Sequence, residues 1–161
     1  MNKILDILLC EINSRKDILK YNNIIFDIFT REDFGIVINR LEYFSNFSEN
    51  WNGINSSSPS EACIAKTLFA ILLYFLICYK NKFNVGLIQL ILIKEGGINL
   101  EIYIEKCSLE IEILNKIAIE EVAEYKYLLY DYNDSYVVNE DIISEEKLTE
   151  LYTRFQTCIK K

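Results

Sequence analysis

Histidine is entirely absent from the 161 residues of this chain. Imidazole is the base in Ser-His-Asp and Cys-His nucleophilic sites and a frequent ligand of catalytic zinc. Every mechanism that uses imidazole as the base or as a metal ligand is therefore excluded. No other catalytic signature stands in its place, so the sequence favours a protein that binds rather than one that catalyses.

Cysteine is present, but it matches neither a disulfide framework nor a zinc site. The five cysteines are odd in number, form no C-x-x-C pair and are widely spaced, at Cys10, Cys63, Cys78, Cys107 and Cys158. Most lie in apolar periodic stretches, where cysteine packs as a small buried hydrophobe. We therefore expect reduced thiols, no metal or other cofactor, and a cytoplasmic protein. Cys107, near the start of a strand, is expected to be the thiol nearest the surface.

Basic residues are in the minority. Lys and Arg number 17 against 24 Asp and Glu, which gives a net charge of −7 and a pI of about 4.7. Binding to a phosphate backbone needs clustered cations, and an acidic chain opposes it through its own repulsion. The charge therefore disfavours direct nucleic-acid binding and favours a basic protein partner.

Uninterrupted apolar runs are short. The longest extends from Leu68 to Tyr79 and is bracketed by Lys66 and Lys80, whereas a membrane span needs about twenty apolar residues. A buried core helix is therefore expected, and a membrane partner is not. A membrane-associated subunit held by residues 68–79 stays open as an alternative.

Proline and tryptophan each occur once, and both lie within residues 49–62, ENWNGINSSSPSEA. The segment predicts a corner between two helices. Ser58 is expected to cap the second helix, with Pro59 at its first position and Glu61 completing a capping box. Trp51 is expected to fold back against that second helix as an anchor.

Apolar residues at helical spacing predict helices before and after this corner. A stripe at 4–12 indicates the first helix, and a second is expected at about 30–47, with Thr30 as its cap. Residues 22–29 fit either a strand or a helical turn. The apolar core helix is expected at about 59–79.

Beyond residue 81 the apolar spacing becomes twofold, as in strands. Adjacent glycines at 96 and 97 predict a β-hairpin turn. Strands are expected at 83–93, 98–105, 107–114, 124–132 and 135–138. Glutamates at 145 and 146 and lysines at 160 and 161 suit the two ends of a last helix. The sequence thus predicts a single α+β domain over residues 1–161: N-terminal helices, the core helix, an antiparallel β-meander at about 83–138 and a C-terminal helix at about 145–160.

Three short motifs follow one another along the chain: Trp51-Asn52-Gly53, Ser58-Pro59-Ser60 and Gly96-Gly97-Ile98-Asn99-Leu100-Glu101. This order resembles small bacterial and phage-borne proteins with a Trp-Asp-Gly-Tyr-Gly-Ala-x-Pro-like corner, an apolar helix and Gly-Gly-Ile/Val-x-Leu-Glu in a β-meander. The resemblance covers roughly residues 36–132. It departs from the pattern at Asn52, where Asp is usual, and at Asn55, where a second Gly is usual. It implies an accessory protein of mobile or defence-type gene settings, with no established reaction.

Candidate binding residues fall in two groups. The first is the corner itself, with Trp51, Asn52 and Gly53. The second lies on the predicted sheet, where glutamates alternate with apolar residues and tyrosines are frequent; it comprises Glu101, Glu105, Glu110, Glu112 and Tyr127, with Tyr125, Tyr130, Tyr132 and Tyr136 near Tyr127. Solvent-facing glutamates suit an acidic patch for a basic partner, although paired carboxylates also bind metals or act as acid and base.

The sequence therefore favours a non-catalytic protein-binding module of an antitoxin-, immunity- or inhibitor-like kind, acting on a protein partner. Its partner would meet an acidic or tyrosine-rich sheet face, or the Trp51 corner. A metal-dependent enzyme using the glutamate cluster is one alternative, and the membrane-associated subunit is another. A homo-oligomer remains open as well, because an exposed strand edge can pair with itself.

Overall fold

The computed structural model describes residues 3–115, 124–131 and 136–158. Helices come first: α1 (Lys3–Asn13), α2 (Lys16–Leu19), α3 (Asn22–Phe29), α4 (Glu32–Ser45) and α5 (Glu61–Asn81). Five strands follow: β1 (Leu87–Leu92), β2 (Ile98–Ile104), β3 (Cys107–Ile113), β4 (Glu124–Asp131) and β5 (Tyr136–Ser144). The chain continues through a 3-10 turn (Glu145–Lys147) into α6 (Leu148–Cys158). The predicted α+β class and order of elements are confirmed.

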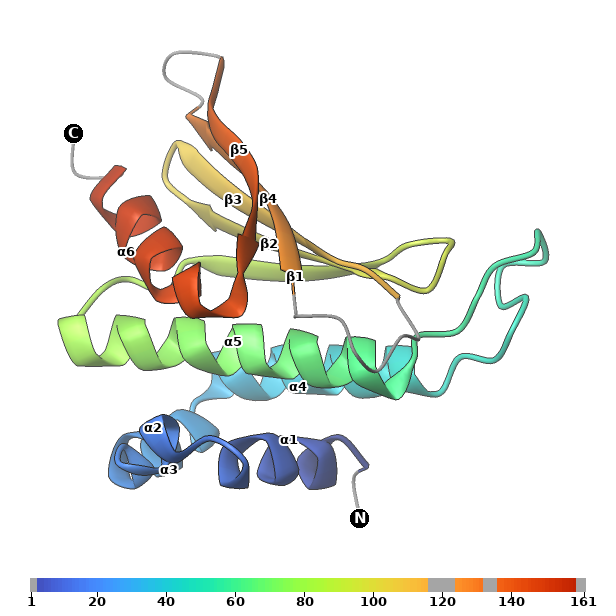
Figure 1. Ribbon diagram of the computed structural model, residues 1–161, viewed down its shortest axis with the longest axis horizontal. Helices are drawn as coiled ribbons and strands as arrows, with labels where there is room; N and C mark the ends of the chain where they lie inside the picture. The colour runs from blue at the N-terminus through green and yellow to red at the C-terminus, as the bar shows by residue number, and fades with distance from the viewer. Residues whose placement is uncertain (1–2, 116–123, 132–135, 159–161) are drawn as a thin grey trace.

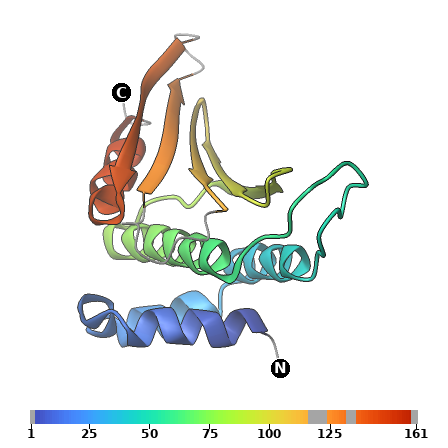
Figure 2. The ribbon, with the colours of Figure 1, turned by 45° about the vertical axis from the view of Figure 1, so that its right-hand side comes forward.

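Helix α5 lies at the centre of the molecule (Figure 1). The N-terminal helices α1–α3 lie on one side of it, α4 runs beside it, and the sheet lies on the other side with α6 near the β4–β5 end. The same layers are visible from the second direction (Figure 2). Because both sides of α5 are covered, its sequence is apolar all round rather than along one stripe.

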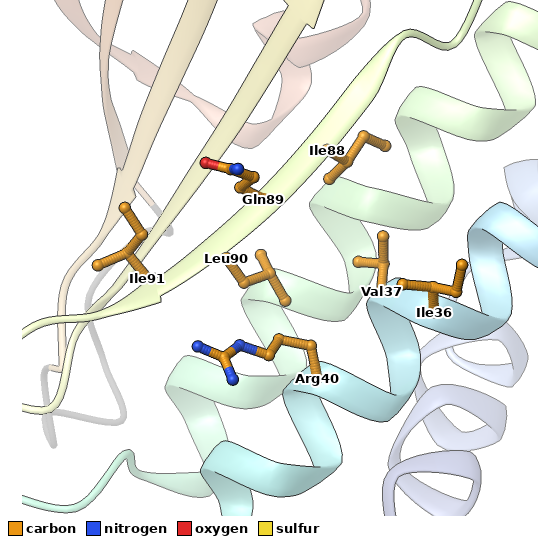
Figure 3. Close-up of a pocket in the computed structure, with 7 residues that line it drawn as sticks. All are labelled: Ile36, Val37, Arg40, Ile88, Gln89, Leu90 and Ile91. Atoms are coloured by element: carbon orange, nitrogen blue, oxygen red, sulfur yellow. The ribbon is translucent and has the colours of Figure 1, made fainter.

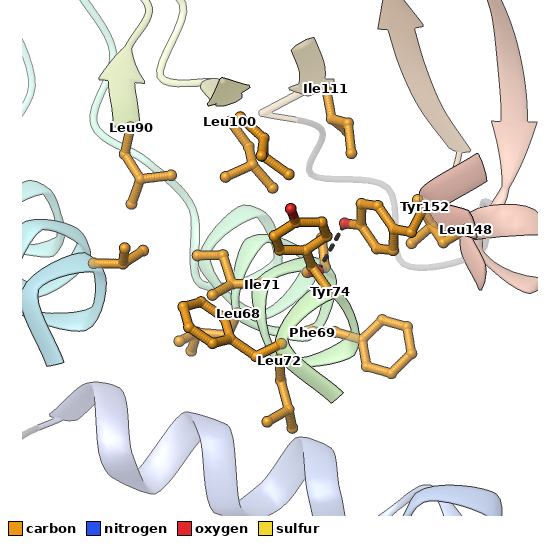
Figure 4. Close-up of a cluster of buried hydrophobic side chains, with 14 of the residues drawn as sticks. Leu68, Phe69, Ile71, Leu72, Tyr74, Leu90, Leu100, Ile111, Leu148 and Tyr152 are labelled. Carbon is orange, nitrogen blue, oxygen red and sulfur yellow. Dashed lines mark hydrogen bonds between the residues drawn. The ribbon is translucent and has the colours of Figure 1, made fainter. Parts of the chain in front are cut away.

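Side chains of α5 fill the core in every direction. Figure 4 shows Leu68, Ile71 and Tyr74 among side chains from the sheet and from α6. Among the described residues, α5 is the one helix whose length and apolar composition would allow it to cross a membrane. Most of this helix is buried inside the protein. The prediction of a buried core helix at this position is therefore confirmed.

Polar groups in this core are paired. The hydroxyl of Tyr74 donates to the Val85 carbonyl at 2.7 Å, and the hydroxyl of Tyr152 donates to the Ala70 carbonyl at 2.7 Å. Gln156 Nε2 donates to the Tyr74 hydroxyl at 3.0 Å. In the described part of the chain, no buried side-chain nitrogen or oxygen lacks a partner. These bonds connect α6 to α5 and set the position of the C-terminal helix, because an unpaired buried polar group is costly.

The sheet is an antiparallel meander in the order β1-β2-β3-β4-β5. The Lys94–Gly97 turn joins β1 to β2 as predicted, since Gly96 N donates to the Ile93 carbonyl at 2.8 Å. Alternate residues of β2 and β3 point into the core, and the intervening residues form the opposite face, which we call the outer face. Glu101 and Glu110 are directly paired on it.

Helix starts differ from the predicted ones. The cap of α5 is Ser60, whose Oγ accepts from Cys63 N at 3.1 Å, and Ser58 and Pro59 precede the helix. The Ser58 capping box is therefore wrong, because Ser58 N and Oγ both donate to Glu49 Oε1 instead. Thr30 ends α3 rather than capping α4, whose N-cap is Arg31.

Other element boundaries also differ from the predicted ones. The undecided segment 22–29 is helix α3, and β5 extends to Ser144, past the predicted end at 138. Predicted strand residues 132 and 135 and the predicted helix residues 159–160 lie outside the described residues. Cys107 is buried whereas Cys10 is exposed, so the expectation for the most accessible thiol is wrong. Cys107 opens β3 on its core-facing side, and Cys10 lies on the outside of α1.

Candidate functional site

The centre of the outer face is polar. Asn99, Glu101 and Tyr103 of β2 lie on it beside Glu110 and Glu112 of β3. The strands bring these side chains together because residues at positions i and i+2 share a face and antiparallel partners lie directly opposite. The predicted grouping of Glu101, Glu110 and Glu112 therefore corresponds to one surface.

Glu101 is held firmly on this surface. Its side chain is only 8% exposed. One carboxylate oxygen, Oε1, accepts from Asn99 Nδ2 at 3.1 Å, and the other, Oε2, accepts from the Tyr103 hydroxyl at 2.8 Å. Two neutral donors thus orient the carboxylate without neutralising its charge.

Glu110 faces Glu101 across the two strands. Partial burial raises the pKa of Glu110, and the neighbouring Glu101 charge raises this pKa further. Glu112 pairs in register with Lys126 of β4. None of the ion pairs within the described residues includes Glu101, Glu110 or Glu112. The outer face therefore holds negative charge that the described chain leaves without a salt bridge.

A shallow cavity lies beside these carboxylates. Its volume is about 250 Å³, and its lining includes Asn99, Glu110, Glu112, Lys126 and Leu128. A concave polar surface of this size can receive one or two side chains of a partner, and it is somewhat smaller than the roughly 300–1,000 Å³ pockets that usually hold small molecules.

Tyr127 also borders this cavity, but its ring belongs to the other side of the sheet. It is 5% exposed, and its hydroxyl accepts from Arg154 Nη2 of α6 at 2.8 Å. Tyr127 was predicted to bind a partner, but its side chain is buried and its hydroxyl is bonded to α6. The alternation of Glu124 and Lys126 with Tyr125 and Tyr127 in the sequence signals this inward orientation.

Glu105 is placed apart from the other glutamates. It lies in the β2–β3 turn with a left-handed φ of 51°, whereas Glu101 and Glu110 lie within strands. Tyr132 lies outside the described residues, and the side chain of Tyr136 is likewise not described.

The Trp51 corner, residues 46–60, is a separate and well-connected loop. The Trp51 ring lies 5.5 Å from the Phe47 ring, and its Nε1 donates to the Ser57 carbonyl at 2.7 Å. Trp51 thus anchors the loop to the segment that follows α4, which differs from the predicted packing against α5. Figures 1 and 2 show the loop projecting beyond the ends of α4 and α5.

Short polar bonds shape the tip of this loop. Asn52 Oδ1 accepts from Ile54 N at 2.8 Å, and Asn50 Oδ1 accepts from Asn55 N at 2.8 Å. Gly53, Asn50 and Asn55 all adopt left-handed backbone conformations, which glycine and asparagine tolerate best. Ile54, 67% exposed, is presented at the tip. The arrangement is a preformed loop with an apolar end.

Asn115 joins the corner to the sheet. Its Oδ1 accepts from Ser60 N at 2.7 Å, and its Nδ2 donates to the Ser58 and Glu95 carbonyls at 3.0 Å each. Sequence reasoning did not find Asn115, because its partners are distant along the chain. It also missed Asn99 and Tyr103, whose role follows only once β2 is known to present Glu101 between them.

No group of three or more Cys, Asp or Glu side chains within the described ranges is arranged to hold a metal ion. Those residues therefore offer no ligand set that would support the metal-dependent alternative. No protein-family model matches the chain, and no curated protein and no solved structure is significantly similar to it. The resemblance to corner-and-meander proteins stays a prediction.

Proposed function

We propose that the chain is a non-catalytic protein-binding module whose outer face receives a basic partner. One observation carries this proposal: three carboxylates, Glu101, Glu110 and Glu112, share the outer face without a salt bridge among the described residues, and two of them, Glu110 and Glu112, line its cavity. Two of them, Glu101 and Glu110, are directly opposed. Like charges at directly opposed positions destabilise a sheet, and a partner's Lys or Arg would remove that cost on binding.

The geometry of the face supports a side-chain guest. Glu101 is nearly buried and is fixed by Asn99 and Tyr103, so it adds a stationary negative charge beside the more exposed Glu110 and Glu112, which would receive the partner's guanidinium or ammonium group. The cavity beside Glu110 and Glu112 provides room for the aliphatic part of that side chain. Charge-assisted hydrogen bonds of this kind contribute about 1.5–3 kcal/mol each.

The overall charge supports the same partner. A net charge of −7 attracts a basic protein from a distance and raises the association rate at low salt. An inhibitor- or immunity-type role, in which an acidic chain masks a basic protein, is the concrete form of the proposal. The corner around Trp51, Asn52 and Gly53 would then add a second, apolar contact through Ile54.

Copurification from the native cell tests this function. The tagged chain is captured from the soluble fraction, and its companions are identified and their stoichiometry measured. We expect one basic protein at equal stoichiometry, released by added salt and largely lost when Glu110→Gln and Glu112→Gln are combined. A chain that is recovered alone and monomeric contradicts the proposal, and recovery in the membrane fraction would favour the membrane-associated alternative.

A further inference from the structure

The β1 edge of the sheet is open. β1 comes first in the strand order, so β2 is its one strand neighbour within the described chain. Ile93 N donates to the Gly97 carbonyl at 2.9 Å, and bonded and non-bonded pairs alternate in an antiparallel ladder. Residues 89 and 91 therefore bond to β2, and the backbone N–H and C=O groups of Ile88 and Leu90 point away from it. An extended chain could bond to these groups.

A groove runs along this edge, between β1 and α4. Its volume is about 380 Å³, and its lining comprises Ile36, Val37, Arg40, Ile88, Gln89, Leu90 and Ile91 (Figure 3). Ile36 is 61% exposed and Ile91 is 45% exposed, so apolar surface is open to water on both sides. The groove offers apolar contacts next to the open backbone groups, which is the combination that strand addition uses.

Arg40 supplies the one charge in the groove. Its side chain extends from α4 toward Leu90 (Figure 3). The guanidinium carbon lies 4.6 Å from the Phe44 ring centroid and 5.6 Å from that of Tyr43, so the aromatic rings hold it in place. It takes part in none of the ion pairs formed by the described residues. Its planar donors are therefore available for a carboxylate.

We propose that this groove binds an extended segment of another protein, which adds to β1 as a further strand and places an acidic side chain on Arg40. Apolar residues at alternate positions of the segment would contact Ile36 and Ile88, since alternate residues of a strand share a face. The groove would bind an acidic segment, whereas the outer face is proposed to bind a basic partner. The two proposals therefore do not depend on each other.

A second copy of the chain fits the groove less well. Two β1 strands can extend one antiparallel sheet only about a two-fold axis perpendicular to it, which leaves both α4 helices on the same side of the junction. Each copy would then bring its own Arg40 guanidinium to the same side of the junction. The sequence of β1, LIQLIL, contains no acidic residue to pair with either group.

A displayed library of random peptides, each long enough to span β1, tests the proposal. We expect enriched peptides to alternate apolar residues and to carry one Asp or Glu. Arg40→Gln should weaken their binding at least about tenfold, and Arg40→Glu should shift enrichment toward Lys or Arg. Lys147→Gln, an exposed side chain in the 3-10 turn before α6, is the matched control and should leave binding unchanged. Enriched peptides with no acidic preference, or equal binding by Arg40→Gln, would overturn the proposal.

Hydrogen exchange of the free and peptide-bound protein locates the binding. The amide proton of Ile88 should exchange fast in the free protein and slowly in the complex, and that of the more buried Leu90 should also slow on binding. The amide protons of Gln89 and Ile91 should be slow in both states. Selection of peptides that leave Ile88 and Leu90 unprotected contradicts strand addition. Protection in the free protein that rises with its own concentration would assign the edge to a second copy and overturn the proposal as well.

Discussion

Glu101 and Glu110 face each other directly across β2 and β3, and Glu101 is 8% exposed. The pKa of Glu110 is raised because its carboxyl is partly withdrawn from water and lies beside the Glu101 charge. Folding therefore brings two negative groups together on the outer face. An opposed pair of this kind lowers stability unless something positive binds to it, which is why it is the centre of the functional proposal.

Stability should depend on pH through Glu110. A carboxyl whose folded pKa is raised binds more protons in the folded than in the unfolded state, so its contribution to stability falls as pH rises from the ordinary carboxyl pKa through the raised one. Glu110→Gln should remove this dependence and raise the melting temperature at pH 7.5 by roughly 1–2 °C. Glu150→Gln on α6 is the matched control. A lower melting temperature of Glu110→Gln at pH 7.5 would contradict the repulsion.

The Trp51 corner should lose stability when its indole N–H is removed. Trp51→Phe keeps a ring against Phe47 but deletes the hydrogen bond to the Ser57 carbonyl. We expect a loss of about 1 kcal/mol in the free energy of unfolding, measured by circular dichroism during urea denaturation. Trp51→Ala should cost more because it also removes the ring contact. Equal stability of Trp51→Phe and the parent chain would show that this bond contributes nothing.

Asn115 should hold the corner against the sheet. Asn115→Ala removes hydrogen bonds to Ser58, Ser60 and Glu95, so we expect about 1–3 kcal/mol of destabilisation. Amide exchange near Ser60 should accelerate, whereas exchange in the centre of β3 should change much less. Uniform acceleration across the protein would indicate global unfolding instead of a local release of the loop.

Gly96 should not accept a side chain. Its φ is +86°, and an added Cβ would meet Asn115 Nδ2 and lie 2.6 Å from the Ser58 carbonyl oxygen. Gly96→Ala should therefore lower the melting temperature. Gly53→Ala should cost less, because its φ is also positive but no heavy atom lies within 4 Å of the added Cβ. Equal melting temperatures for Gly96→Ala and Gly53→Ala would show that the close contact at Gly96 does not affect stability.

Among Cys10, Cys63 and Cys78, thiol labelling should reach Cys10 first. It is exposed, whereas Cys63 and Cys78 are buried, and burial raises the pKa of both buried thiols to about 11. Because the thiolate is the reactive form, iodoacetamide at pH 8 should modify Cys10 well before either of them. Mass spectrometry of peptides after timed labelling gives the order. Early labelling of Cys63 would contradict its position beneath the β1–β2 turn.

Local patterns were enough to predict the central elements. Helical spacing of apolar residues located α4 and α5, and Gly96-Gly97 located the hairpin turn, because both signals act over a few residues. The helix starts were harder to predict, since Ser58 and Ser60 are equally good caps and Glu49 binds Ser58 from the far side of the loop.

Long-range contacts account for what the sequence could not reveal. Asn115 bonds to residues more than fifty positions earlier in the chain, and no spacing rule encodes such a pair. The open groove beside β1 depends on where α4 packs, which is a tertiary outcome. The acidic set was different, because strand alternation already placed Glu110 and Glu112 on one face.

The most direct test of the central claim is the affinity of the captured partner for a charge-reversed outer face. Titration calorimetry at low and moderate salt would compare the parent chain with Glu110→Lys combined with Glu112→Lys, and with Glu150→Lys as the control. The account predicts at least about a hundredfold weaker binding for the double variant, a parent affinity that falls with salt, and little change in the control. Equal affinity of the double variant and the parent chain would contradict it.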